Sequence, residues 1–266
     1  MSTVRKQLRY LQVLLVFAFR ERWIVENVGR DIRAVGHAPR GRRRAFTRAE
    51  VGAIFALPIF VRPWSLRTNR QIGNDTLRWL LLIALTTGAR LEEIGQLQPD
   101  DIRADDGIVH MVIDDVDASG VKNPNKSIKN IGARRRVPLN SDLLKLGLQE
   151  RAARLRREGV MHLFPDLHLD EFGHYTSNAS RCCNRLIDKV TRDPRVVFHS
   201  LRHFLKDLFR EAGMLESVSD QLTGHAPVTV GGRYGSGVSL AQLKAQLERL
   251  RFEFVDWERI YAASRL

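Results

Sequence analysis

Basic side chains and a flexible glycine occur together at a position that suits a phosphate ligand. The segment TGAR at residues 87–90 places Arg90 directly after Gly88 and Ala89, at the expected start of a helix. Free backbone N–H groups at such a start favour anions, and an arginine beside them can bind the same anion. Glu93 follows three residues later on the same helix face and could orient the guanidinium. Taken alone, a surface ion pair explains the segment equally well.

A basic turn spans residues 126–136 and contains two of three neighbouring lysines, Lys122, Lys126 and Lys129. A lysine on a hairpin can enter a DNA groove, touch a base edge and donate a proton. A solvated run of charge is the alternative interpretation of this turn.

Two further segments bring histidine together with arginine or tyrosine. His199 and Arg202 are three residues apart, so one helix face would carry a proton-transfer group and a phosphate-binding group. His203, one turn after His199, is expected to pack in the core. Gly224 allows a turn to present His225, and Tyr234 follows nine residues later between an arginine and a glycine, unlike a core tyrosine.

Taken in order, six side chains match the Arg–Lys–His-x-x-Arg–His/Trp–Tyr pattern of tyrosine recombinases, the phage integrase family: Arg90, Lys129, His199, Arg202, His225 and Tyr234. The surrounding strings TGARLEEI, KNIGARRRVPL, HSLRH, LTGH and RYGSG also resemble that family. The resemblance covers about residues 46–250. Alignment with the family's second hairpin strand selects Lys129 among the three lysines.

The resemblance implies strand cleavage and rejoining of DNA, integrating or excising a mobile element such as a prophage. Tyr234 would attack the scissile phosphate, giving a 3′-phosphotyrosine and a free 5′-hydroxyl. His199 would accept the phenol proton, and Lys129 would protonate the leaving 5′-oxygen. No metal or nucleotide cofactor is expected.

The remaining site residues would act on the phosphate. The resemblance implies that Arg90 and Arg202 bind its non-bridging oxygens and that His225 donates a hydrogen bond to it. Glu93 would support Arg90, and His203 is expected as a supporting residue beside His199.

The elements that carry these residues are mainly helical. We expect helices at about 4–28, 75–87, 91–97, 177–192, 200–212, 215–222, 230–235 and 239–250, with a basic linker at 36–44. Thr47 and Glu50 have the spacing of a capping box. Asn140 is expected to cap a helix that runs to about residue 158. Extended runs at 108–113 and 135–139 predict one small antiparallel sheet. We expect a solvated loop at four acidic residues, Asp100, Asp101, Asp105 and Asp106.

The implied fold class is mainly α (α+β), a helical catalytic domain of the tyrosine recombinase type with one small antiparallel sheet. Residues 46–266 would form this domain, and residues 1–45 a helix and basic linker that resemble a remnant of the family's core-binding domain. Because that domain is usually longer, we expect a shortened N-terminal region and weak, unselective DNA binding. The apolar stretch from Leu11 to Phe19 is expected to be a buried helix face, since charged residues follow it without a signal-peptide cleavage site.

Composition agrees with a polyanionic partner. The 266 residues include 43 Lys or Arg against 30 Asp or Glu, a net charge of +13. The partner predicted is double-stranded DNA, with contacts from Arg42, Arg43, Arg44, Lys122, Lys126 and Arg134. The two adjacent cysteines exclude a disulfide framework or a cysteine-based zinc site. They favour a bacterial cytoplasmic, nucleoid-associated protein, and no apolar run reaches the ~18–20 residues of a membrane span.

The C-terminal segment from Val238 onwards is amphipathic, and two interpretations of it remain open. It docks on a neighbouring copy within a synaptic tetramer, or it packs on its own domain. Three alternative functions also remain: a non-catalytic DNA-binding integrase remnant, a type IB topoisomerase-like enzyme that relaxes supercoils, and an RNA-binding or structural helical protein.

Overall fold

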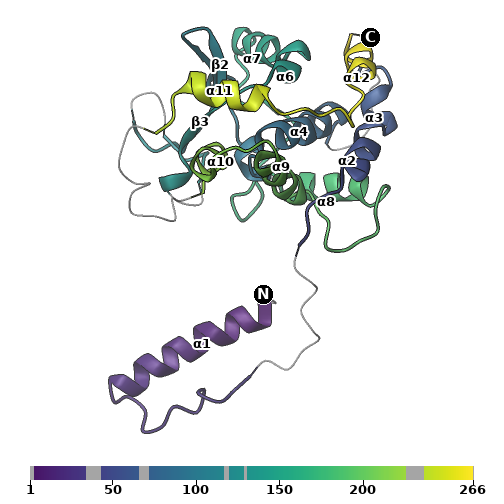
Figure 1. Cartoon of the computed structure of the whole chain (residues 1–266). Coiled ribbons are helices and arrows are strands. Elements are labelled where there is room, and N and C mark those ends of the chain that lie inside the picture. The colour runs from purple at the N-terminus through teal and green to yellow at the C-terminus, as the bar shows by residue number, and fades with distance from the viewer. Residues whose placement is uncertain are drawn as a thin grey trace. The chain divides into compact units, whose positions relative to one another are not determined.

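The chain forms two compact units, residues 1–42 and residues 43–266. The computed structural model describes residues 3–33, 43–65, 72–116, 120–128, 131–225 and 237–265 (Figure 1). In outline it is helical with one three-stranded antiparallel sheet, so the predicted fold class is confirmed.

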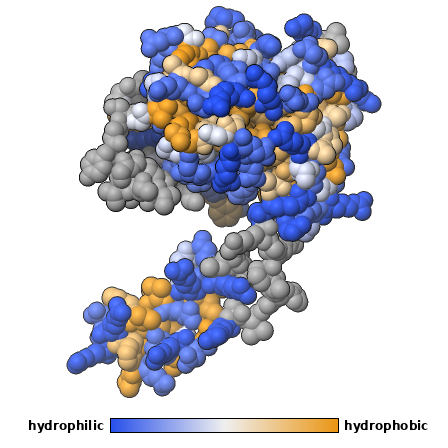
Figure 2. Space-filling view, viewed as in Figure 1, coloured by the Kyte–Doolittle hydropathy of each residue, from blue (hydrophilic) through white to orange (hydrophobic). Residues whose placement is uncertain are grey.

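The first unit contains a single described helix, α1 (Thr3–Arg20). The expected helix to residue 28 is wrong in length, because Arg22 adopts a left-handed backbone with φ of 58° and turns follow. The predicted burial of its apolar face is also wrong: Leu14 is 64% and Phe17 50% exposed. Figure 2 shows apolar and hydrophilic side chains interspersed along this helix.

Near the beginning of the second unit, the guanidinium of Arg44 binds Glu50 at 2.7 Å and Asp193 at 2.8 Å. The capping box between Thr47 and Glu50 is present and starts α2 (Arg48–Phe55). A short helix, α3 (Pro58–Val61), follows. These contacts fix the beginning of the unit against the loop that contains Asp193.

The centre of the second unit is α4 (Asn74–Thr87), which is buried on all sides from Thr76 onwards. It packs against α8 (Ser177–Ile187) and α9 (Ser200–Glu211). Gly88 ends α4 with φ of 66°, and α5 (Leu91–Gly95) starts immediately afterwards. Because this helix is buried on every face, it lies inside the core, and the segments around it pack against it.

The sheet has the order β1 (Ile102–Asp105), β2 (Ile108–Ile113) and β3 (Arg135–Pro138), all antiparallel. Strands β2 and β3 were predicted, whereas β1 falls in the region expected to be a solvated loop. That expectation is wrong for Asp101, which is buried and paired with Lys126. A tight turn follows Asp105, the last residue of β1. In this turn Asp106 has φ of 50°, a conformation that Asp tolerates.

The helix expected from residue 141 to 158 is two helices, α6 (Ser141–Lys145) and α7 (Leu148–Arg157). Gly147 separates them with φ of 89°, and Asn140 caps α6 as predicted. After α9 come α10 (Glu216–Thr223), α11 (Leu240–Glu248) and α12 (Trp257–Ser264). Helix α12 was not predicted, α8 ends five residues early, and the helix expected at about 230–235 lies outside the described residues.

The C-terminal segment packs on its own unit. Helix α11 contacts β2 and β3, and the apolar side chains after it lie in the main core. Phe252, Phe254 and Trp257 form successive edge-to-face ring contacts. Both cysteines are free, with Cys183 buried. Among the described residues, no helix has the length and apolarity to cross a membrane.

Candidate active site

Arg90 lies at the start of α5, immediately after the left-handed turn at Gly88. Its backbone N–H donates to Glu93 Oε2 at 2.8 Å, and its Nη1 donates to Glu93 Oε1 at 2.6 Å. Its Nη2 points to the carbonyl oxygen of Gly224 at 3.4 Å. The predicted support of Arg90 by Glu93 is therefore a direct contact, and it is more than a surface ion pair because Glu93 is 4% exposed.

A second arginine, Arg135 on β3, shares the Glu93 carboxylate. Its Nη2 donates to Glu93 Oε2 at 2.7 Å, and both side chains are almost fully buried. Burial alone would raise the pKa of Glu93, but the charge and hydrogen bonds of Arg135, then those of Arg90, bring it below its ordinary value. Sequence reasoning did not single out Arg135, which lies between two other arginines.

Arg202 is buried on α9 and is held by the turn that ends α4. Its Nη1 donates to the carbonyl oxygen of Gly88 at 2.8 Å, and its Nη2 lies 3.1 Å from His225 Nδ1. Burial, followed by repulsion from Arg90 and Arg135, lowers the pKa of Arg202 to about 9. The Arg202 guanidinium thus joins the α4–α5 turn to the turn after α10.

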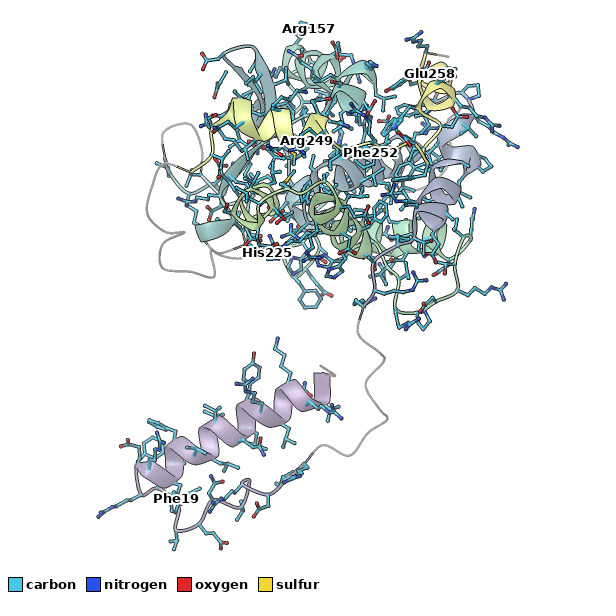
Figure 3. The ribbon with its side chains drawn as sticks, in the orientation of Figure 1. Phe19, Arg157, His225, Arg249, Phe252 and Glu258 are labelled. Atoms are coloured by element: carbon cyan, nitrogen blue, oxygen red, sulfur yellow. The ribbon has the colours of Figure 1, made fainter. Side chains whose placement is uncertain are left out.

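His225 follows Gly224, which ends α10 with φ of 67° (labelled His225 in Figure 3). Since a guanidinium can only donate, Arg202 faces an acceptor nitrogen of this ring, and its Nη2 lies 3.1 Å from Nδ1 and 3.4 Å from Nε2. Thr223 Oγ1 lies 3.0 Å from the same Nδ1. Burial and the charge of Arg202 lower the pKa of His225 to about 4, so at pH 7 the ring is neutral and keeps one N–H donor.

His199 is exposed at the start of α9, with its ring edge-to-face on His203 at a centroid distance of 5.1 Å. Desolvation, then repulsion from His203, Arg202, Arg90 and Arg43, lowers the pKa of His199 to about 4. The ring is therefore neutral at pH 7 and able to accept a proton. His203 is exposed too, so its predicted core packing is wrong: it shares the outer face of α9 with His199.

The cluster carries more positive than negative charge. Arg90, Arg135 and Arg202 bring three guanidinium groups, and Glu93 compensates one of them. A further carboxylate, Asp220, is paired with Lys206 at 3.0 Å. Within the described part of the chain, the site therefore has unmatched positive charge, which an anion such as a phosphate would neutralise.

Three predicted residues, Arg42, Lys129 and Tyr234, lie outside the described residues. Among the other predicted DNA contacts, Arg43 and Lys122 are exposed, and Arg43 lies near enough to His199 to affect its pKa. Arg44 and Arg134 are ion-paired, the latter with Asp115 at 2.8 Å.

Lys126 is buried, and its ammonium binds Asp101 at 2.6 Å with Asp114 at 3.6 Å. This placement contradicts the prediction that Lys126 contacts DNA, because its charge faces the interior of the unit.

The second unit is thus a helical domain with a small antiparallel sheet, and a cluster of arginines and histidines lies near the start of α9. The family model described as "Phage integrase family" matches residues 68–236, and the chain belongs to this family. No curated protein shows significant sequence similarity to the chain.

Two kinds of solved integrase share the fold. The integrase from mycobacterium phage Brujita is 16% identical, with 97% of this chain and 76% of that chain covered and a TM-score of 0.50. The Tn1549 transposon integrase in complex with transposon right end DNA is 17% identical, with 93% of this chain and 79% of that chain covered and a TM-score of 0.51. The same integrase with a circular intermediate DNA reaches a TM-score of 0.53 at 16% identity. At such identities the likeness concerns the fold alone.

Proposed function

We propose that this phage integrase family member is an active site-specific recombinase that cleaves and rejoins DNA through a 3′-phosphotyrosine. The observation that carries the proposal is the convergence of Arg90, Arg202, His225 and His199, which come from three distant segments, around one positively charged site. Contacts link Arg202 with His225 and Arg90 with Gly224, and the charges of Arg202 and Arg90 act on His199, which supports the proposal.

In the proposed reaction, Tyr234 Oη attacks the scissile phosphorus as the bond to the 5′-oxygen breaks. The phenol proton passes to neutral His199, and Lys129 gives a proton to the leaving oxygen. Arg90 and Arg202 bind the non-bridging oxygens, and the imidazole N–H of His225 donates to one of them. Because the phosphotyrosine keeps the ester bond energy, a 5′-hydroxyl from another strand can reverse the step without ATP.

We further propose double-stranded DNA as the partner, in the bacterial cytoplasm, with assembly into a tetramer during strand exchange. The C-terminal segment is the expected contact between copies. Since its apolar side chains are buried in their own unit, such a contact would use the exposed polar residues of α11 and α12.

The test is covalent capture on a pool of nicked duplexes with randomised sequence, followed by washing in denaturant. The chain is expected to retain DNA that resists the wash, and Tyr234→Phe to retain none. DNA binding by both proteins without any denaturant-resistant adduct would overturn the proposal and support the non-catalytic alternative.

A further inference from the structure

We propose that Arg135 is a positioning residue, which fixes the positions of the phosphate-binding side chains of the site relative to one another. The identity of the ligand rests on the proposed function. In the sequence this arginine lies between two others, Arg134 and Arg136. The inference comes from what its guanidinium touches.

Arg135 connects three elements with one side chain. From β3, its Nη2 donates to Glu93 Oε2 on α5 at 2.7 Å, and its Nη1 lies 3.3 Å from Glu93 Oε1. Its Nε donates to the carbonyl oxygen of Leu222, near the end of α10, at 2.8 Å. Its Nη1 also donates to Ala133 at 2.8 Å, within its own hairpin.

The contacts with Glu93 and Leu222 each lead to a side chain of the proposed site. Glu93 holds Arg90 through both its guanidinium and its backbone N–H. The Leu222 carbonyl lies in the last turn of α10, directly before the turn that presents His225. A Cβ on Gly224 would lie 2.4 Å from Arg135 Nη1, so the guanidinium fills the space beside that turn.

Arg135 does not contact a ligand itself. The residue is 9% exposed, and Nε, both hydrogens of Nη1 and one of Nη2 are already engaged. A buried pair that served stability alone could be replaced by apolar side chains of similar volume at little cost. Here the planar guanidinium reaches a carboxylate and two carbonyls at once, which neither an apolar group nor a lysine can do.

The first measurement is the single-turnover rate of adduct formation on duplexes recovered from the covalent-capture pool. Arg135→Met is expected to lower the rate about 100-fold, the effect of displacing reacting groups by about 1 Å, while DNA affinity stays the same. Glu93→Gln should lower it as well, and the double variant should be no slower than the slower single variant, because both act through one contact. Arg136→Met, an exposed neighbour on the same strand, is the control.

The second measurement does not depend on activity. In DNA-free protein, Arg135→Met should move the His225 titration, followed by NMR, from its lowered pKa towards the ordinary value, and Arg136→Met should not. If Arg135→Met fails to fold, Arg135→Lys keeps a cation beside Glu93 and is measured in both experiments, with the same losses expected.

The outcomes separate the two proposals. Wild-type cleavage rates in the Arg135 variants, or additive losses with Glu93→Gln, would overturn the positioning role. If the wild-type chain forms no adduct, the proposed recombinase fails, and the His225 titration alone decides the role of Arg135: an unchanged titration overturns it.

Discussion

At the scale of single residues, the site consists of cations held in place by backbone carbonyls and one shared carboxylate. Arg202 donates to the carbonyl of Gly88, and Arg90 reaches that of Gly224. Burial and mutual repulsion lower the pKa of Arg202, so the unliganded cluster is electrostatically unfavourable. A phosphate would relieve this repulsion without any rearrangement, which is the arrangement expected of a preorganised transition-state site.

The histidines give a pH-dependent prediction. Both His199 and His225 have pKa values lowered from 6.5 to about 4, so they stay neutral in the folded protein where the unfolded chain would protonate them. The unfolded state therefore binds more protons between these values, and the free energy of unfolding falls as pH drops through that window.

DNA is expected to reverse this shift, because phosphate charge next to the rings stabilises the imidazolium forms. NMR titration of the free and DNA-bound protein, with signals assigned through His199→Asn and His225→Asn, should show both pKa values rising on binding. Values that fall or stay the same with bound DNA would mean that the phosphates do not reach this cluster.

At the scale of elements, the site depends on two left-handed glycine turns that bring α5, α9 and α10 together. Gly88 has φ of 66°, and a Cβ there would lie 3.0 Å from Leu205 and 3.3 Å from Thr223. Gly224 has φ of 67° and lies against Arg135. Such turns admit glycine alone without strain or displacement of a neighbour.

Gly224→Ala and Gly213→Ala form a matched pair. Both positions have φ of +67°, but a Cβ at Gly213 has no atom within 4 Å. Each alanine should cost about 1–2 kcal/mol of backbone strain. Gly224→Ala should lose about 2 kcal/mol more by overpacking against Arg135, together with most cleavage activity. Equal melting temperatures and equal activity of the two variants would show that this turn is not constrained as described.

Lys126 ties the hairpin before β3 to the start of β1 by a buried ion pair with Asp101. Burial raises the pKa of Asp101 and Lys126 lowers it, so the lysine favours the charged form of this buried carboxylate. Lys126→Met should therefore destabilise the chain by about 3 kcal/mol in urea unfolding, and a double variant with Asp101→Asn should recover part of the loss. Exposed Lys122→Met is the control, and an unfolding midpoint shared by all variants would refute the structural role.

The sequence was most informative where a local pattern determines the structure by itself. The apolar run of α4 and the capping box at Thr47 are predictable for this reason. The family pattern selected Arg90, His199, Arg202 and His225, and their catalytic roles stay a prediction. Arg135 was not predictable, because three arginines follow one another and only strand pairing buries the middle one. Asp101 was not predictable for the same reason: Asp100 is exposed, whereas tertiary contact with Lys126 buries Asp101. The predicted core packing of His203 was wrong because His203 lies on the same helix face as His199, and that face is exposed.

At the scale of the whole molecule, the net charge of +13 favours DNA binding driven by counterion release. The logarithm of the binding constant should fall linearly with the logarithm of salt concentration. Arg43→Met, beside the site, should reduce that slope by about 0.9. Arg157→Met, an exposed change on the opposite side of the unit from His225 (Figure 3), should not alter it. Equal slopes for both variants would place the DNA on another surface.

In the reaction that we propose, a phenol oxygen of this chain becomes esterified to the 3′ end of cut DNA. Mass spectrometry of the nuclease- and protease-digested adduct tests it most directly. We expect a nucleotide 3′-phosphate attached to Tyr234 and a free 5′-hydroxyl on the released strand. A nucleotide on any other residue, or a 5′-phosphate linkage, would contradict it.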